Sequence, residues 1–131
     1  SVVKIQHPST RVGKLIFGKH VSMRKTIELD MVGDITIGDH VIFSNYVKVF
    51  THEHNLKSKK IILSEDENNG VLWSNLTIGN DVYFGINSVI TENVTNIPDG
   101  VVIGANAVLT KNPEPYEIWG GVPAKKIGER V

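Results

Sequence analysis

The chain has 131 residues, a length that suits one domain, and its 14 basic and 14 acidic residues give a formal net charge of zero. This balance excludes the strongly basic field that favours nucleic acid or an anionic membrane, and no apolar run approaches the roughly 20 residues of a membrane span. The absence of cysteine excludes disulfides, thiolate zinc sites and a cysteine nucleophile, and it is compatible with a cytoplasmic protein.

Small, mostly apolar residues recur every six positions through most of the chain. After the first run the register slips by two residues, and before the last run one residue is inserted. A period of six fits neither an amphipathic helix nor a strand that alternates between two faces. The four runs are Leu15, Val21 and Ile27; Ile35, Val41 and Val47; Leu76, Val82, Ser88 and Val94; and Val101 and Ala107.

The repeating unit reads I-G-[DN]-x-V, as in IGDHV at 37–41 and IGNDV at 78–82, with the variants FGKHV at 17–21 and IGANA at 103–107. Hexapeptide repeats are typical of a parallel β-helix, in which each short strand carries one aliphatic side chain inward. Glycine and Asn or Asp would turn the corners because they tolerate unusual backbone dihedral angles. Three strands then close a triangular coil, and coils stack about 4.8 Å apart. A β-sandwich of short strands is the alternative.

Several strand positions beyond the inward-facing one are also apolar. A narrow prism has little interior per coil, so it commonly buries such a face by oligomerising. The sequence therefore predicts a homo-oligomer, and threefold symmetry would match a three-sided prism. The positions concerned are Val2, Val3, Ile42, Phe43, Tyr46, Tyr83, Phe84 and Val102.

Residues 12–128 resemble the hexapeptide-repeat acyltransferases, most closely the O-acetyltransferases of the galactoside, maltose and xenobiotic type. The segments that carry the resemblance are ITIGDHVIFSNYVKVFTHEHN (35–55), LTIGNDVYFGINSVI (76–90) and VVIGANAVLTKNPEPYEIWGGVPAKKIGE (101–129). The resemblance implies a single all-β domain over residues 1–131, built as a left-handed parallel β-helix. It also implies a loop insertion at about 52–75, a C-terminal extension at about 112–131 that caps the prism, and a homotrimer with active sites between subunits.

The stretch VFTHEHN at 49–55 interrupts the repeat and holds two histidines. Acyl transfer from a thioester needs a base that takes the proton of the attacking acceptor, and a neutral histidine suits this task near pH 7. In the family the general-base histidine lies where a strand leaves the prism for the loop, and His52 matches that position. His54 would line the acceptor pocket or be solvated, and Glu53 would be solvated or orient a histidine of a neighbouring subunit.

Two residues of the first coil fall near the family's acceptor-binding positions. Asp30 lies just before the two-residue slip, where the family places acidic or amide groups that hold the acceptor. Arg24 lies near a position that is an amide in the sugar-specific members, and an exposed structural role is the alternative for both residues. The family's loop reaches over the neighbouring subunit; the residues that could anchor it here are Ile61, Ile62, Leu63 and Trp73.

The resemblance implies acetyl-CoA as co-substrate, bound in a groove between two prisms. Gly85 and Ala105 match backbone positions that line this groove, and Tyr83 stands where a tryptophan is more usual and would cover the pantetheine arm. Thr110, Lys111 and Lys125 match positions near the coenzyme phosphates. Pro123 matches the proline that contacts the adenine in the family. A capping role of the C-terminal tail is the structural alternative.

These features predict an acetyl-CoA-dependent transfer of an acetyl group to a hydroxyl of a saccharide-type acceptor, by direct attack and without a covalent enzyme intermediate. N-acetylation of an amino sugar and acetylation of a xenobiotic such as an antibiotic are alternatives within the family. A zinc enzyme like the γ-carbonic anhydrases, with His40, His52 and His54 as candidate ligands, and a non-catalytic β-helix scaffold are alternatives outside it. The preferred interpretation includes no metal, nucleic acid or membrane partner.

Overall fold

The computed structural model describes residues 3–6, 12–54 and 71–131. All helices and strands identified in these ranges are β-strands; there is no helix among them. Sheet A contains β1 (Val3–Gln6), β4 (Ile27–Asp30), β7 (Lys48–Val49), β12 (Val89–Ile90) and β15 (Val108–Leu109). Sheet B contains β2 (Leu15–Phe17), β5 (Ile35–Ile37), β10 (Leu76–Ile78) and β13 (Asn96–Ile97). Sheet C contains β3 (Ser22–Met23), β6 (Ile42–Phe43), β11 (Tyr83–Phe84), β14 (Val102–Ile103), β16 (Glu117–Gly121) and β17 (Ala124–Glu129). A separate ribbon pairs β8 (His52–His54) with β9 (Val71–Trp73).

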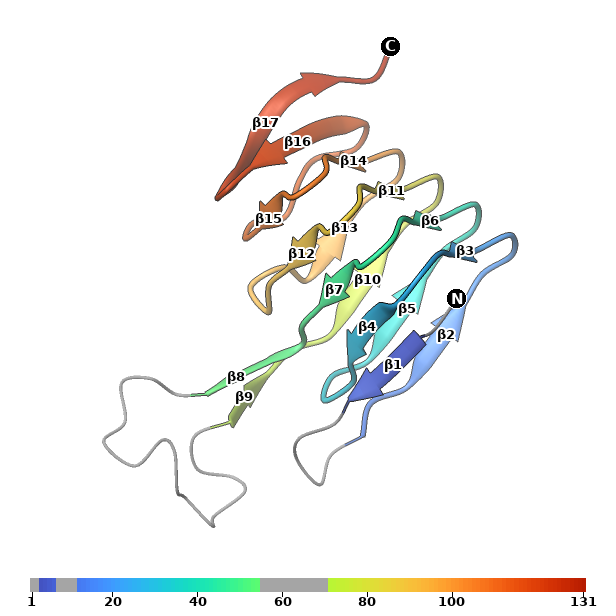
Figure 1. Ribbon diagram of the computed structural model, residues 1–131, viewed down its shortest axis with the longest axis vertical. Helices are drawn as coiled ribbons and strands as arrows, with labels where there is room; N and C mark the ends of the chain where they lie inside the picture. The colour runs from blue at the N-terminus through green and yellow to red at the C-terminus, as the bar shows by residue number, and fades with distance from the viewer. Residues whose placement is uncertain (1–2, 7–11, 55–70) are drawn as a thin grey trace.

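The chain visits sheets B, C and A in turn and so winds four coils: β2–β3–β4, β5–β6–β7, β10–β11–β12 and β13–β14–β15 (Figure 1). Equivalent strands of successive coils pair in parallel. At the C-terminal end β16 adds to β14 in parallel, and β17 folds back on β16 antiparallel. The prediction of an all-β chain with stacked parallel strands is confirmed. No helix in the described part of the chain is long and apolar enough to cross a membrane.

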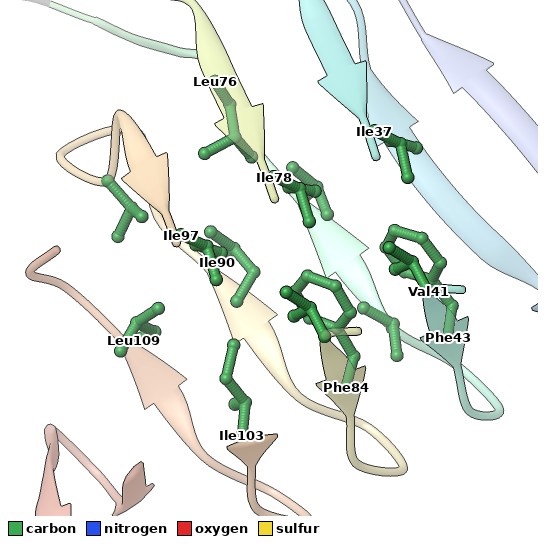
Figure 2. Close-up of a cluster of buried hydrophobic side chains, with 14 of the residues drawn as sticks. Ile37, Val41, Phe43, Leu76, Ile78, Phe84, Ile90, Ile97, Ile103 and Leu109 are labelled. Atoms are coloured by element: carbon green, nitrogen blue, oxygen red, sulfur yellow. The ribbon is translucent and has the colours of Figure 1, made fainter. Parts of the chain in front are cut away.

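In the second and third coils, each side buries two side chains, two residues apart, rather than the single one predicted. On sheet C, for example, Val41 and Phe43 are both fully buried, and Figure 2 shows such pairs filling the interior. The rings of Phe43 and Phe84 stack in successive coils with centroids 4.4 Å apart. The expectation that these two phenylalanines belong to an outer apolar face is therefore wrong, because the period of two along a strand returns the second residue to the interior. Ile42 and Tyr83, between them, are exposed.

The motif I-G-[DN]-x-V turns a corner in a different way from the one predicted. Its glycine provides clearance, since a Cβ atom on Gly38 would lie 2.6 Å from the carbonyl oxygen of Gly79 in the next coil. The Asn or Asp side chain caps the preceding coil: Asn80 Oδ1 accepts the backbone N–H of Asp39 at 2.7 Å. The left-handed backbone conformation falls on the variable residue, with φ of 58° at His40.

All three departures from the six-residue period fall on one edge of the prism, where the chain passes from sheet A to sheet B. We call this edge AB; its segments are 31–34, 50–75 with the ribbon, 91–95 and the residues after β15. The pairing of Leu15 with Ile35, Ile35 with Leu76 and Ile78 with Ile97 places the extra residues there. The edge between sheets C and A, called edge CA, keeps a constant length; its segments are 24–26, 44–46, 85–87 and 104–106.

Candidate active site

His52 stands where the chain leaves edge AB and enters the ribbon. β7 ends at Val49, and His52 opens β8, where it pairs with Trp73 of β9. The position therefore matches the strand-to-loop exit at which the sequence resemblance put a general base. The His52 side chain is 15% exposed, so it is largely enclosed yet accessible from outside. His54 is the last residue of β8, and only its backbone belongs to the described structure.

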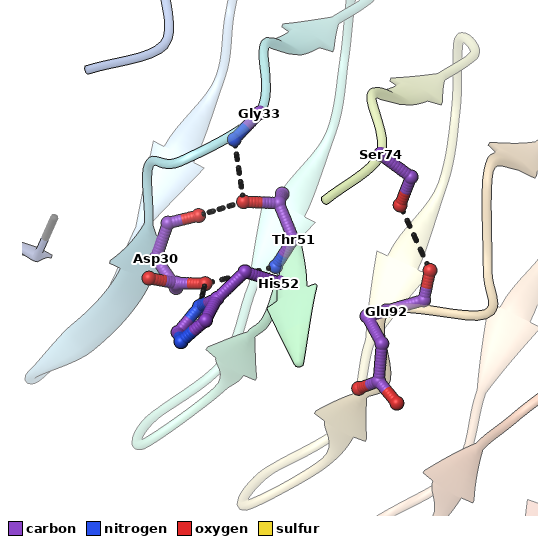
Figure 3. A network of polar contacts seen from close by, with 6 residues as sticks. All are labelled: Asp30, Gly33, Thr51, His52, Ser74 and Glu92. Carbon is purple, nitrogen blue, oxygen red and sulfur yellow. Dashed lines mark hydrogen bonds and ion pairs between the residues drawn. The ribbon is translucent and has the colours of Figure 1, made fainter. Parts of the chain in front are cut away.

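The imidazole of His52 is held by Asp30, the last residue of β4. His52 Nδ1 hydrogen-bonds to Asp30 Oδ2, which also accepts the backbone N–H of Thr51 at 3.1 Å (Figure 3). The Thr51 hydroxyl donates to the Asp30 carbonyl oxygen at 2.5 Å and accepts the Gly33 N–H at 2.9 Å. Asp30 and Thr51 are both buried. The two-residue slip after β4 thus forms a corner whose backbone and side chains fix one carboxylate against one imidazole.

This arrangement can activate a nucleophile. A carboxylate on Nδ1 favours the tautomer that carries its proton there, which leaves the basic lone pair on Nε2. The same carboxylate stabilises the imidazolium that forms when Nε2 takes a proton. The sequence assigned Asp30 to the acceptor and did not predict its contact with His52. The signal that could have revealed it is the strand register, because β4 and β7 are adjacent in sheet A and end together at edge AB.

Glu53, expected to be solvated or to orient a histidine, instead meets a second carboxyl group, Glu92. A hydrogen bond with the Glu92 side chain, partial burial and the negative charge of Glu92 raise the pKa of Glu53 above its ordinary value of 4.5. The two side chains share a pocket of about 100 Å³ between the ribbon and the corner after β12. Ser74 Oγ donates to the Glu92 carbonyl oxygen at 2.9 Å. The pocket is lined by Glu53, Leu72, Trp73, Ser74, Glu92 and Asn93.

Arg24, also predicted to bind the acceptor, lies on edge CA, whereas Asp30 and His52 lie at edge AB. Strand β4 separates the two edges, so one chain by itself does not bring Arg24 to His52. Arg24 and Tyr83 both line a shallow pocket of about 360 Å³. Within the pocket the Ser44 hydroxyl donates to the Tyr83 hydroxyl at 3.1 Å.

The residues predicted to hold the cofactor are divided among four places, of which the first is the outer face of sheet C, where Tyr83 is exposed in β11. Gly85 and Ala105 stack on edge CA, where a Cβ atom on Gly85 would lie 2.5 Å from the Ala105 nitrogen. Thr110 and Lys111 follow β15 on edge AB. Pro123 and Lys125 are exposed in the β16–β17 hairpin, with Pro123 between the two strands and Lys125 in β17.

The remaining sequence predictions concern the loop and a metal. Ile61, Ile62 and Leu63 lie outside the described residues, and Trp73 is half-exposed in β9. His40 stacks on His20 at the edge between sheets B and C, with ring centroids 5.0 Å apart. Within residues 12–53 and 72–131, no three His, Asp or Glu side chains are grouped so that they could hold a metal ion.

Comparisons with known sequences find acetyltransferases among the proteins that this chain resembles. No protein-family model matches the chain. The galactoside O-acetyltransferase of Escherichia coli K12 is 36% identical over 96 residues, which are 72% of this chain and 44% of that protein. A chloramphenicol acetyltransferase of Agrobacterium fabrum is 48% identical over 67 residues, which are 50% of this chain and 32% of that protein. The matched region thus spans less than half the length of either relative.

Solved structures share the fold over nearly the whole chain. The maltose O-acetyltransferase from Clostridium difficile 630 superposes with a TM-score of 0.78 at 24% identity, covering 100% of this chain and 68% of that chain. Galactoside acetyltransferase in complex with coenzyme A superposes with a TM-score of 0.67 at 22% identity, covering 96% and 64%. In sequence the chain is similar to galactoside and chloramphenicol acetyltransferases, and its fold is that of the solved maltose, galactoside and hexapeptide-repeat acetyltransferases.

Proposed function

We propose that the protein transfers an acetyl group from acetyl-CoA to a hydroxyl of a saccharide-type acceptor, with His52 as general base. The observation that carries the proposal is the hydrogen bond between His52 and the buried Asp30 at the exit to the ribbon. Two sequence relatives are named acetyltransferases, and a solved structure of this fold is described in complex with coenzyme A. We also assign the coils the left-handed sense that the family resemblance implies.

Asp30 and His52 suffice for the proton transfers of the reaction. Bound acetyl-CoA would supply an activated thioester, so no covalent enzyme intermediate is needed. Asp30 holds the ring through Nδ1 while Nε2 accepts the hydroxyl proton of the acceptor as its oxygen attacks. The imidazolium then returns the proton to the departing thiol. General-base catalysis of this kind contributes typically about 10²- to 10⁴-fold.

We propose that the working site is a seam between two subunits of a homotrimer. The candidate residues occupy two different edges, and a cyclic assembly places one surface of each subunit against a different surface of the next. If the threefold axis runs parallel to the prism, rotation about it does not shift a subunit along the prism. Residues at the same height in two neighbouring subunits would therefore face each other. Asp30, His52 and Arg24 lie in the first two coils, whereas Gly85, Ala105, Thr110 and Lys111 lie in the last two.

Sheet C supports this assembly because its outer face is apolar. Ile42 and Tyr83 point outward from adjacent strands and are 40% and 42% exposed. On sheet B the outward residues of successive strands are Ile16, Thr36, Thr77 and Asn96, so three of the four are polar. Burial of the sheet C face against a neighbour would remove apolar surface from water, at about 25 cal/mol per Å².

The proposed function is tested by incubating the protein with acetyl-CoA and a panel of acceptors. The panel contains neutral sugars, amino sugars and chloramphenicol, the last because of the A. fabrum relative. Thiol release and the mass of the acetylated product are measured together. We expect acceptor-dependent thiol release with a gain of one O-acetyl group on a sugar. Selective acetylation of chloramphenicol would favour the xenobiotic alternative, and no acetylated product with any acceptor would contradict the proposal.

A further inference from the structure

The pocket beside Arg24 combines one cationic side chain with neutral hydrogen-bonding groups. Its volume is about 360 Å³, and it lies on edge CA and the adjoining outer face of sheet C. Arg24 is the charged residue of the lining, and the other lining residues are Ile42, Ser44, Asn45, Tyr83 and Ile86. The Ser44 and Tyr83 hydroxyls are hydrogen-bonded to each other, so they already face a common space.

No acidic side chain in the described part of the molecule forms an ion pair with Arg24. Among the described side chains, the ion pairs are His52–Asp30, Lys126–Glu117, Lys126–Glu129 and Arg130–Asp81, and none includes Arg24. The backbone at this corner is fixed, since the Arg24 N–H donates to the Phe43 carbonyl oxygen at 2.9 Å. Asn45 Oδ1 accepts the Lys25 N–H at 3.0 Å, so its NH₂ group is what it can offer to a ligand.

We propose that this pocket recognises an oxyanion, a carboxylate or a phosphate, carried by the acceptor. The guanidinium presents a planar fork of donors that matches both groups in bidentate fashion. The Tyr83 hydroxyl, which accepts the Ser44 O–H and keeps its own proton, and the amide of Asn45 add neutral donors beside it. The inference rests on the proposed function and narrows it, because it makes the acceptor an acidic or phosphorylated saccharide rather than a neutral one.

The height of Arg24 along the prism separates it from the expected coenzyme phosphates, while Tyr83, which lines the same pocket, is the residue predicted to cover the neutral pantetheine arm. Arg24 and Asn45 belong to the corners of the first and second coils, level with Asp30 and His52. In the proposed trimer, the pocket of one subunit therefore lies opposite the His52 of the next. The lysine predicted near the coenzyme phosphates, Lys111, follows the fourth coil at the other end of the seam. An anion bound at Arg24 thus belongs to the acceptor.

The test compares galacturonate, galactose 6-phosphate and galactose as ligands of the intact protein with coenzyme A present. Binding is followed by ligand-observed NMR and turnover by thiol release. We expect the wild type to favour at least one anionic sugar over galactose by about tenfold or more, as one charge-assisted contact at a partly exposed site provides. Arg24→Gln should abolish the preference and Arg24→Lys should retain part of it. Lys25→Gln, which removes a neighbouring charge, should leave the preference intact.

A preference for galactose in the wild type would overturn the inference and leave the proposed function standing. So would an undiminished anion preference in Arg24→Gln, an equal loss in Lys25→Gln, or a loss of coenzyme A affinity in Arg24→Gln. Failure of the protein to bind coenzyme A or to acetylate any acceptor would instead contradict the proposed function, and this inference with it. Preference for galacturonate over galactose 6-phosphate, or the reverse, identifies which oxyanion the pocket takes.

Discussion

Replacement of His52 by alanine is expected to lower kcat by about 10²- to 10⁴-fold, because the acceptor hydroxyl then lacks a base. The affinity for coenzyme A and the oligomeric state should not change, since the side chain contributes to neither proposed contact. The measurements are kcat at saturating acetyl-CoA, coenzyme A affinity by titration, and mass in solution. Retention of wild-type kcat would exclude His52 as the base.

Two further variants sharpen this result. Asp30→Asn should lower kcat less than His52→Ala but in the same direction, because an amide cannot stabilise the imidazolium on Nδ1 as a carboxylate does. His20→Ala removes an exposed histidine that stacks on His40 far from edge AB, and it should leave kcat unchanged. If the Asp30→Asn variant kept the wild-type kcat, the contact between Asp30 and His52 would have a structural role and no catalytic one.

Replacement of Phe84 by alanine is expected to lower the free energy of unfolding by about 3–5 kcal/mol. The ring is fully buried and stacks on Phe43 in the preceding coil, so its removal leaves a cavity that the rigid coils cannot close. The matched control is Phe17→Ala, at a side chain that is 49% exposed and should cost about 1 kcal/mol or less. Urea unfolding at one protein concentration measures both; equal losses would contradict the assignment of Phe84 to the core.

The repeat made the architecture predictable because each residue of the hexapeptide has a local task. The aliphatic position, the corner glycine and the Asn or Asp were all visible in IGDHV and IGNDV. What the sequence did not reveal is the second inward residue, since Phe43 and Phe84 share their strands with Ile42 and Tyr83 and all four are apolar. Only the three-dimensional register shows which of two adjacent apolar residues faces the interior.

The parts of the candidate site that lie at breaks in the six-residue repeat could be predicted from the sequence. His52 was identified by its place at the largest break, and Asp30 was noticed because it precedes the first slip. Asp30 and His52 are 22 residues apart in sequence, and their contact depends on the pairing of β4 with β7, which no local pattern encodes. Glu92 was missed for the same reason: its corner meets the ribbon only in the folded chain.

The most direct test of the account is activity in mixed oligomers of two variants that damage opposite edges. His52→Ala disables edge AB, and Ala105→Trp obstructs edge CA with a bulky ring. Each pure variant should be nearly inactive, whereas a refolded equal mixture should recover about one quarter of wild-type activity, because about one seam in four joins two intact edges. A mixture as inactive as its parents, with oligomers of unchanged mass, would contradict a catalytic site assembled between subunits.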